Sequence, residues 1–170
     1  MKITKLTSYL MILTLTGCAN HPVKTEPLVM KKVVYSSNAV ISEAIRNECD
    51  LPNILSTFIK TAAESQYPHI MDDTASTDAQ AEILSVEITH VEGAAGGAWT
   101  GLKSVAINAT LTKQGRAIGD FKAARISNNV ALLGVGSIGG TCGILRHCIK
   151  TLSGDVAKWL ENPTPNAVLK

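Results

Sequence analysis

The chain has 170 residues, with sixteen Lys and Arg, fourteen Asp and Glu, and only two Trp, three Tyr and two Phe. This length suits one domain whose core must be built from Ile, Leu, Val and Ala. Two of the basic residues, Lys2 and Lys5, lie in the first 17 positions, so residues 18–170 have a formal net charge of zero. A neutral chain offers no electrostatic case for binding nucleic acid or an anionic membrane surface.

The N-terminus has the layout of an export signal. Two lysines precede an apolar stretch, Leu6 to Leu15, which is too short to cross a bilayer as a permanent helix. The run Leu15-Thr16-Gly17-Cys18 follows directly and resembles the lipobox of bacterial lipoproteins. That resemblance implies cleavage of a signal peptide, residues 1–17, and attachment of acyl chains such as palmitate to Cys18.

Residues 18–30 are predicted to be a lipidated tether, because two prolines and mixed polar residues bury too little surface to order themselves. Ala19 follows the lipidated cysteine, where Asp would resemble an inner-membrane retention signal. We therefore expect a lipid anchor in the outer membrane of the cell envelope, with the body of the protein facing the periplasm.

Residues 31–163 are predicted to form a single periplasmic domain. Residues 32–36 are expected to be a first strand, and residues 42–48 a short helix with Ser42 as its cap. Residues 52–65 are predicted to form an amphipathic helix, because their apolar side chains recur at helical spacing. Pro52 would lie in its first turn, where a missing N–H costs nothing. Residues 71–80 are polar and predict a loop.

The second half of the chain predicts three strands and a helix. Apolar and polar residues alternate over residues 84–89 and 105–112, and a third strand is expected over residues 117–126. Gly115 provides positive φ for the hairpin turn between the last two strands. An amphipathic helix is expected over residues 143–160, with a loose tail over residues 164–170. The order predicts a two-layer α+β domain, with helices packed on one face of a mainly antiparallel sheet of about four strands.

Three cysteines remain once Cys18 carries lipid, and export to an oxidising compartment favours a disulfide. A bond from Cys49 to Cys142 or to Cys148 would join the helical region to the C-terminal helix. We favour Cys49–Cys148, because Cys148 lies on the predicted buried face, and keep Cys142 as the alternative partner. Two further possibilities remain. Cys142 and Cys148 could pair if Cys142 precedes the helix and the chain bends, or all three thiols could be buried and unpaired.

Glycine-rich segments supply the candidate binding surface. Trp99 is a large ring in a glycine-rich loop, and such a ring either packs back onto the sheet or marks a contact surface. Gly134 to Gly139 match the spacing G-x-G-x-x-G, but after the next helix we expect no strand with an acidic residue to complete a dinucleotide site. We therefore interpret this segment as a loop, and predict binding to a partner through a set of five residues: Gly97, Trp99, Gly101, Gly136 and Gly139.

No group of residues assembles a nucleophile, a base and an oxyanion site, so we expect no catalysis. Neither a metal site nor a cofactor is expected, because the spacing Cys142-x₅-Cys148 matches no usual set of metal ligands. The alternative function is an enzyme or small-ligand carrier of the periplasm. Its pocket would lie near His90, Arg125 and Arg146 and would gather converging polar groups.

Three segments carry a family resemblance: Gly96 to Ser104, Gly140 to Cys148, and Asp155 to Leu160. Together with Cys49, they resemble a group of small uncharacterised lipoproteins from Gram-negative bacteria. The layout is more distantly similar to lipoprotein domains of curli secretion and of Tol-associated proteins, which implies a role in envelope assembly. The expected function is therefore that of a membrane-anchored lipoprotein whose periplasmic domain binds a protein or another envelope component. The sequence does not specify the oligomeric state.

Overall fold

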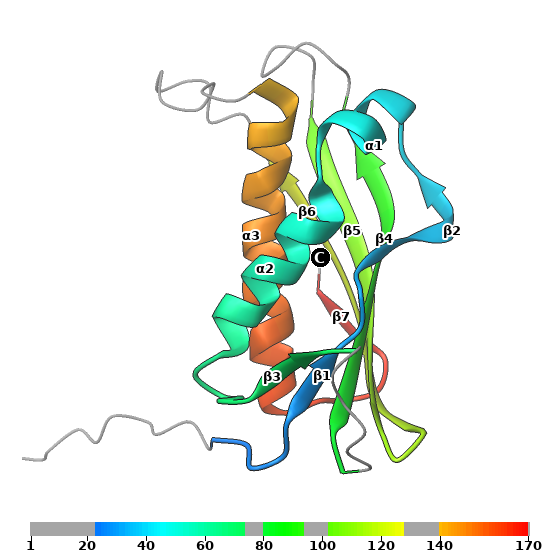
Figure 1. The fold of residues 1–170 in the computed structure, drawn as a ribbon. Helices are drawn as coiled ribbons and strands as arrows, with labels where there is room; N and C mark the ends of the chain where they lie inside the picture. The colour runs from blue at the N-terminus through cyan, green and yellow to red at the C-terminus, as the bar shows by residue number, and fades with distance from the viewer. Residues whose placement is uncertain (1–22, 74–79, 94–101, 128–139, 170) are drawn as a thin grey trace, which may run out of the picture.

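The amphipathic segments and alternating strands of the sequence form a helical layer against one sheet in the computed structural model, which describes residues 23–73, 80–93, 102–127 and 140–169 (Figure 1). The elements in chain order are β1 (Leu28–Met30), β2 (Val34–Val40), α1 (Glu43–Glu48), α2 (Leu51–Ala63), β3 (Ile70–Asp72), β4 (Glu82–Glu92), β5 (Lys103–Lys113), β6 (Arg116–Ser127), α3 (Gly140–Glu161) and β7 (Ala167–Leu169).

The three described helices lie close to their predicted positions. The Ser42 side chain caps α1 by accepting a hydrogen bond from the backbone N–H of Ile45 at 3.4 Å. Pro52 stands in the first turn of α2, where its missing N–H leaves no hydrogen bond unmade. Every fourth residue of α2 is buried, which turns one stripe of the helix toward the sheet: Leu51, Leu55, Ile59 and Ala63.

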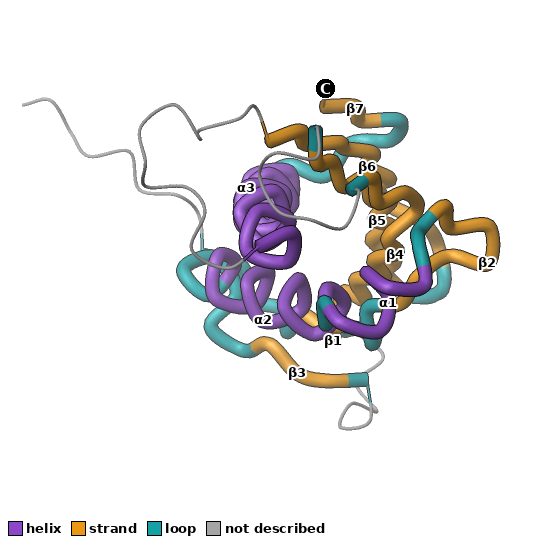
Figure 2. Tube along the Cα trace, turned by 90° about the horizontal axis from the view of Figure 1, so that it is seen from above, coloured by secondary structure: helices purple, strands orange, loops and turns teal. Residues whose placement is uncertain are grey.

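The C-terminal helix α3 covers the other half of the sheet beside α2. It begins at Gly140, three residues earlier than predicted, and its buried stripe includes Leu145, Leu152 and Val156. Near its end, the Trp159 ring stacks on Phe121 of β6 with ring centroids 5.5 Å apart. All three helices lie on one side of the curved sheet (Figure 2), so the predicted two-layer α+β class is confirmed.

The sheet has seven strands and is mixed, so the prediction of about four mainly antiparallel strands was wrong in detail. Strands β4, β5 and β6 form the expected antiparallel centre, in the order β3-β1-β4-β5-β6-β7. Strand β2 pairs with β4 in parallel, farther along the same edge that β1 occupies. The additional strands β1, β3 and β7 have only three residues each. A period of two cannot be recognised over so short a run.

Parts of the predicted tether and of the predicted loop form strands of the sheet. Leu28, Val29 and Met30 were assigned to the tether, yet they form β1 and are almost completely buried. Strand β1 lies between β4 and β3, so part of the predicted loop at 71–80 is also a strand. Burial of three apolar side chains outweighs the disorder that the neighbouring prolines favour.

The predicted loose tail is tied to the sheet as well. Strand β7 pairs in parallel with Phe121 to Ala123 of β6. Asp120 accounts for much of this attachment, because its backbone N–H donates to the Thr164 carbonyl at 3.3 Å and its carboxylate accepts from the Asn166 N–H at 3.0 Å. The Trp159 indole N–H also donates to the Thr164 carbonyl at 3.3 Å. Side chains distant in sequence therefore order the end of the chain.

The hairpin between β5 and β6 is the turn that the sequence predicted. Gln114 and Gly115 both have positive φ, at 51° and 74°. Two such residues between antiparallel strands match the twist of the strands they join. This hairpin and the first described residues, 23–27, lie at one end of the sheet, opposite the end that carries α1 and the start of α3 (Figure 1). We call these the hairpin end and the disulfide end.

Candidate functional site

The disulfide end contains the described residues that border both glycine-rich segments in the sequence. Strand β4 ends at Glu92 and β5 begins at Lys103, on either side of the first segment. Strand β6 ends at Ser127 and α3 begins at Gly140, on either side of the second. Glu92, Ser104 and Ile126 are register partners across the sheet, so these ends lie side by side. A Cβ added at Gly93 would lie 3.4 Å from Thr141 Cγ2, so the start of α3 also lies beside these strand ends.

A disulfide joins Cys49, the C-cap of α1, to Cys142 in the first turn of α3, with a Cα–Cα distance of 5.3 Å. The favoured pairing of Cys49 with Cys148 was therefore wrong, and the alternative partner forms the bond. Cys148 lies six residues farther along α3, and its thiol faces the Lys103 carbonyl at 3.9 Å, away from α1. A buried position on α3 did not identify the partner, because the buried stripe faces the sheet. Burial raises the pKa of the Cys148 thiol.

The predicted binding residues Gly97, Trp99, Gly101, Gly136 and Gly139 lie outside the described residues, as does Cys18. The structure does describe the residues that border the first glycine-rich segment. Gly93, the last described residue before the first segment, packs so closely that an added Cβ would lie 2.9 Å from Lys103 Cδ and 3.3 Å from Ile45 Cδ1. The end of β4, the start of β5 and helix α1 thus form one packed base below the segment.

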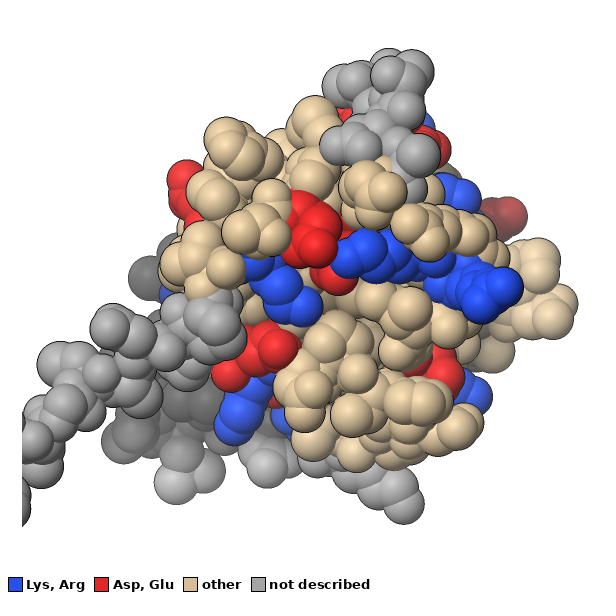
Figure 3. All heavy atoms as spheres, turned by 90° about the horizontal axis from the view of Figure 1, so that it is seen from below, with Lys and Arg blue, Asp and Glu red and all other residues tan. Residues whose placement is uncertain are grey.

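The hairpin end contains a cluster of polar side chains that sequence analysis did not find. Glu82 at the start of β4 has a side chain only 6% exposed, and it accepts a hydrogen bond from the Tyr67 hydroxyl at 2.5 Å. Lys24 and Lys113 place their Nζ atoms 3.9 and 3.8 Å from the Glu82 carboxylate. Lys113 also pairs with Glu26 at 3.0 Å. Figure 3 shows basic and acidic side chains interleaved across this end.

These interactions shift the ionisation of three members of this cluster, which we call the hairpin-end cluster. The hydrogen bond from Lys113 lowers the pKa of Glu26 from 4.5 to about 2, and the same bond raises the pKa of Lys113. Burial raises the pKa of Tyr67, and its hydrogen bond to the Glu82 carboxylate raises it further. Each shift favours the charged lysine and glutamate and the neutral tyrosine that the contacts require.

The hairpin-end cluster ties the N-terminal segment to the body of the domain. The backbone N–H of Lys24 donates to the Gln66 carbonyl at 2.8 Å, and the Gln66 side chain donates to the Ala157 carbonyl of α3 at 3.0 Å. The segment before β1 is therefore held against α2, α3 and the hairpin. The residues of the hairpin-end cluster are dispersed from residue 24 to residue 113. No local spacing in the sequence predicts that they lie close together.

The alternative pocket near His90, Arg125 and Arg146 does not form among the described residues. His90 is the register partner of Ala106, on the sheet face away from the helices. Arg125 lies on the helical side and pairs with Asp155 of α3 at 2.8 Å. Arg146 places its guanidinium over the Phe58 ring, 5.1 Å from the centroid. Two of the three predicted pocket residues thus have structural contacts on the helices, and the third lies on the opposite face.

A hollow of about 510 Å³ lies elsewhere, between α2 and the strands β1 and β3. Met30 and Val33 form a buried apolar floor, and Ser56 and Thr57 stand on its α2 side. Lys60 and Asp72 form an ion pair of 2.5 Å across its rim. The hollow is open to solvent, and its polar groups lie on the rim. Such a shape suits weak binding of a small polar molecule better than enclosure of a substrate.

Among the described residues, no group of three His, Cys, Asp or Glu side chains is placed to hold a metal ion. Within the same ranges, no helix combines the length and apolar character needed to cross a bilayer.

No protein-family model matches the chain, and no curated protein matches its sequence significantly. Solved structures do match its fold. An uncharacterised protein aligns over 83% of this chain and 95% of its own, at 14% identity and a TM-score of 0.54. A Xanthomonas campestris protein of family DUF330 aligns over 88% and 91%, at 14% identity and a TM-score of 0.52. A minor lipoprotein from Acinetobacter baumannii aligns over 79% and 91%, at 16% identity and a TM-score of 0.46.

These likenesses show a fold that the chain shares with other proteins over nearly their whole length. At this level of identity a likeness shows the fold alone, and a function has to be inferred from the residues of this chain.

Proposed function

We propose that the protein is a lipid-anchored component of the bacterial envelope, and that its domain binds a protein or another envelope component through the disulfide end. The observation that carries this proposal is the separation of the two ends. The N-terminal segment, which would bear the lipid at Cys18, is tied to the hairpin end by Lys24 and Glu26. The described ends of β4, β5 and β6 that border the two glycine-rich segments in the sequence lie at the other end (Figure 1).

The distances involved support a defined orientation at the membrane. Five peptide steps separate Cys18 from Val23, the first described residue, and they span at most about 18 Å when fully extended. The 22 residues of α3 run from one end of the domain to the other, a length of roughly 33 Å. The anchor would hold the hairpin end near the bilayer, and the disulfide end would project into the periplasm.

The disulfide has a clear role in this proposal. Helix α1 has six residues and buries only Ile45, so its own contacts stabilise it weakly. The Cys49–Cys142 bond attaches it to the first turn of α3, directly beside the second glycine-rich segment. A binding surface built on loops needs such a rigid support, because the cost of ordering the loops is then smaller. The sequence gathers no pattern of nucleophile, base and oxyanion donors in these segments, and the function we propose is binding without catalysis.

Two measurements test the proposal. Labelled palmitate should be incorporated by the wild-type chain and not by Cys18→Ala, which should also leave the envelope fraction. A photo-crosslinking residue at Leu102, which is 53% exposed beside the first glycine-rich segment, should capture a partner in intact cells. The same residue at the exposed Arg116 of the hairpin end is the matched control and should not capture that partner. Equal capture at both positions would contradict binding at the disulfide end.

The hollow beside α2 favours a second candidate function, that of a carrier for a small polar ligand. Ser56→Trp would fill the hollow from the half-buried side of α2 while leaving the two ends of the domain unchanged. If the protein is a carrier, this variant should lose a small molecule that co-purifies with the wild type, as measured by native mass spectrometry. Retention of the molecule would refute the carrier function.

A further inference from the structure

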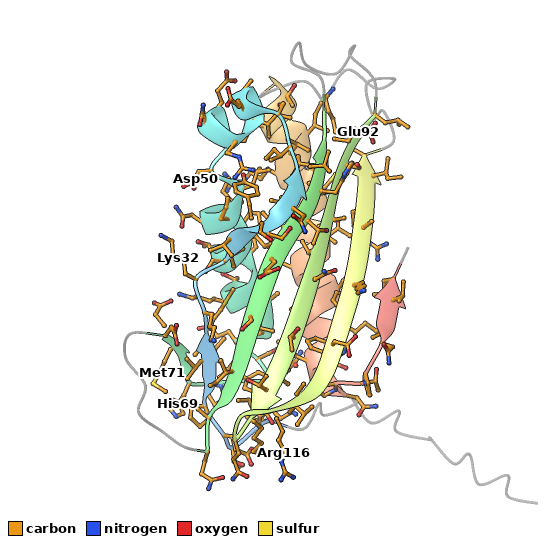
Figure 4. The ribbon with its side chains drawn as sticks, turned by 90° about the vertical axis from the view of Figure 1, so that its right-hand side faces the viewer. Lys32, Asp50, His69, Met71, Glu92 and Arg116 are labelled. Atoms are coloured by element: carbon orange, nitrogen blue, oxygen red, sulfur yellow. A yellow bond between two sulfur atoms is a disulfide. The ribbon has the colours of Figure 1, made fainter. Side chains whose placement is uncertain are left out.

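The sheet has a broad face that no described helix covers (Figure 4). In the central strands, the residues on this face are mainly small and neutral, as in Ser85, Ala106, Asn108, Thr110 and Ala124. Large apolar side chains also stand on it, and three of them are well exposed: Val34 at 43%, Ile126 at 57% and Val168 at 58%. A sheet face with few long charged side chains resembles the inner face of a two-sheet packing more than a solvated one.

One row across this face has a symmetric chemistry. The register aligns five side chains from edge to edge, in the order Val34, Glu87, Asn108, Lys122, Val168. The row thus reads apolar, acidic, amide, basic, apolar. Glu87 and Lys122 lie two strands apart, about 10 Å between backbones, and in the described part of the chain they do not pair with each other. Both are exposed, and neither has an ion-pair partner among the described residues.

We propose that this face binds a second copy of the same chain, and that the two sheets pack face to face about a two-fold axis that runs along β5 through Asn108. The axis reverses the row, so Glu87 of each copy meets Lys122 of the other. Val34 then meets Val168, and the two Asn108 side chains meet on the axis. Every member of the row finds a suitable partner, as an isologous interface requires.

Only an axis along β5 places the unlike charges of Glu87 and Lys122 opposite each other. A two-fold axis along the row, across the strands, would place Glu87 against Glu87 and Lys122 against Lys122. The axis along β5 also keeps the two hairpin ends at the same end of the dimer. Both Cys18 anchors could then enter one bilayer, a consequence that rests on the proposed lipid attachment. The charge pattern and the anchor thus select the same geometry independently.

The available area is sufficient for a stable dimer. Strands β4 and β5 have eleven residues each, a length of roughly 36 Å. Four strand spacings separate β2 from β7 across the face, a width of roughly 19 Å. The product is about 700 Å² on each copy, close to the roughly 800 Å² that each partner buries in a standard interface. The small central side chains allow two sheets to approach within about 10 Å, a gap that Glu87 and Lys122 can span.

Charge reversal tests the pairing in the full-length lipidated protein, dissolved in a mild detergent and measured by sedimentation velocity. The wild type should be a dimer. Glu87→Lys and Lys122→Glu should each weaken the dimer by roughly thirtyfold, because two unlike pairs become two like pairs. An equimolar mixture of the two variants should form a heterodimer in which both pairs are again unlike. The double variant, Glu87→Lys with Lys122→Glu, should also dimerise like the wild type.

Two controls keep the result specific. Glu48→Lys on α1 and Lys158→Glu on α3 reverse exposed charges away from this face and should leave the dimer unchanged. A zero-length carbodiimide applied to a mixture of isotopically light and heavy chains should join Glu87 of one to Lys122 of the other. A monomeric wild type would overturn the proposed dimer, and so would a dimer that neither charge reversal weakens. Neither result would bear on the proposed binding at the disulfide end. Loss of palmitate labelling would refute the lipid anchor and leave the dimer in detergent intact.

Discussion

The two ends of the domain are stabilised by different means. The disulfide end combines a six-residue helix with the roots of two glycine-rich segments, and a covalent bond spanning 93 positions crosslinks it. The hairpin end has no disulfide among the described residues and is held by Tyr67, Glu82 and three charged partners. Helix α1, which buries only Ile45, is therefore held by a crosslink. A region where five chain segments meet relies on hydrogen bonds and ion pairs.

This difference has a functional consequence under the proposed orientation. The hairpin end would lie near the membrane, where its task is to hold the N-terminal segment in place. The disulfide end would carry the binding surface, where loops need a rigid base. The disulfide depends on the redox conditions of the compartment, whereas the hairpin-end cluster depends on pH. The two ends can therefore be perturbed separately.

Loss of the disulfide should have the largest effect. Cys49→Ser releases a loop of 93 positions, and the free energy of unfolding should fall by about 4 kcal/mol, because the unfolded chain regains the entropy of that loop. Chemical denaturation with and without reductant measures the effect. Cys148→Ala is the matched control and should cost only about 1 kcal/mol, since Cys148 is a buried unpaired thiol. A larger loss in the free energy of unfolding from Cys148→Ala than from Cys49→Ser would contradict the assigned pairing.

Truncation of Glu82 should be nearly as damaging at the other end. Glu82→Ala removes the hydrogen-bond acceptor of the Tyr67 hydroxyl and a carboxylate near two lysines, at a cost of about 3 kcal/mol in the free energy of unfolding. Glu48→Ala removes an exposed carboxylate from α1 and should cost less than about 0.5 kcal/mol. Urea denaturation of both variants gives the comparison, and equal costs would show that the cluster does not stabilise the hairpin end.

The β5–β6 turn should respond with the sign that its backbone requires. Gly115→Ala forces a side chain into positive φ and should lower the free energy of unfolding by about 1 kcal/mol. Gln114→Asn should raise it by about 0.5 kcal/mol, because Asn tolerates positive φ better than Gln. Thermal unfolding of the two variants should shift in opposite directions. Shifts of the same sign would argue against this turn geometry.

The smallest effect should appear in acid. The pKa of Glu26 is lowered to about 2 in the folded protein from an ordinary value of 4.5, so the folded state favours the charged carboxylate. Its contribution is complete above about pH 4.5 and is lost as the pH falls toward 2. Glu26→Gln should therefore reduce the slope of thermal stability against pH in that window and leave it unchanged near neutrality. An unchanged slope between pH 4.5 and 2 would contradict the Glu26–Lys113 pairing.

The candidate site was only partly predictable. The presence of a disulfide followed from three remaining cysteines and the expected export, but its pairing did not. Cys142 and Cys148 both lie on α3, and only the packing of α1 against the first turn of that helix decides between them. The hairpin-end cluster was not predicted at all. Each of its side chains looks like an ordinary surface residue until the fold brings it to Glu82.

The sequence by itself determined the elements whose signal is local. Period-two alternation predicted the antiparallel centre of the sheet, Ser42 and Pro52 marked the starts of two helices, and Gly115 marked the hairpin. Only the tertiary structure decided β1, β3 and β7, because a three-residue strand is stabilised by the strands beside it and not by its own pattern. The same holds for the open face and its row of five side chains. Residues from five strands become neighbours only through the register of the sheet, and no spacing along the chain records that register.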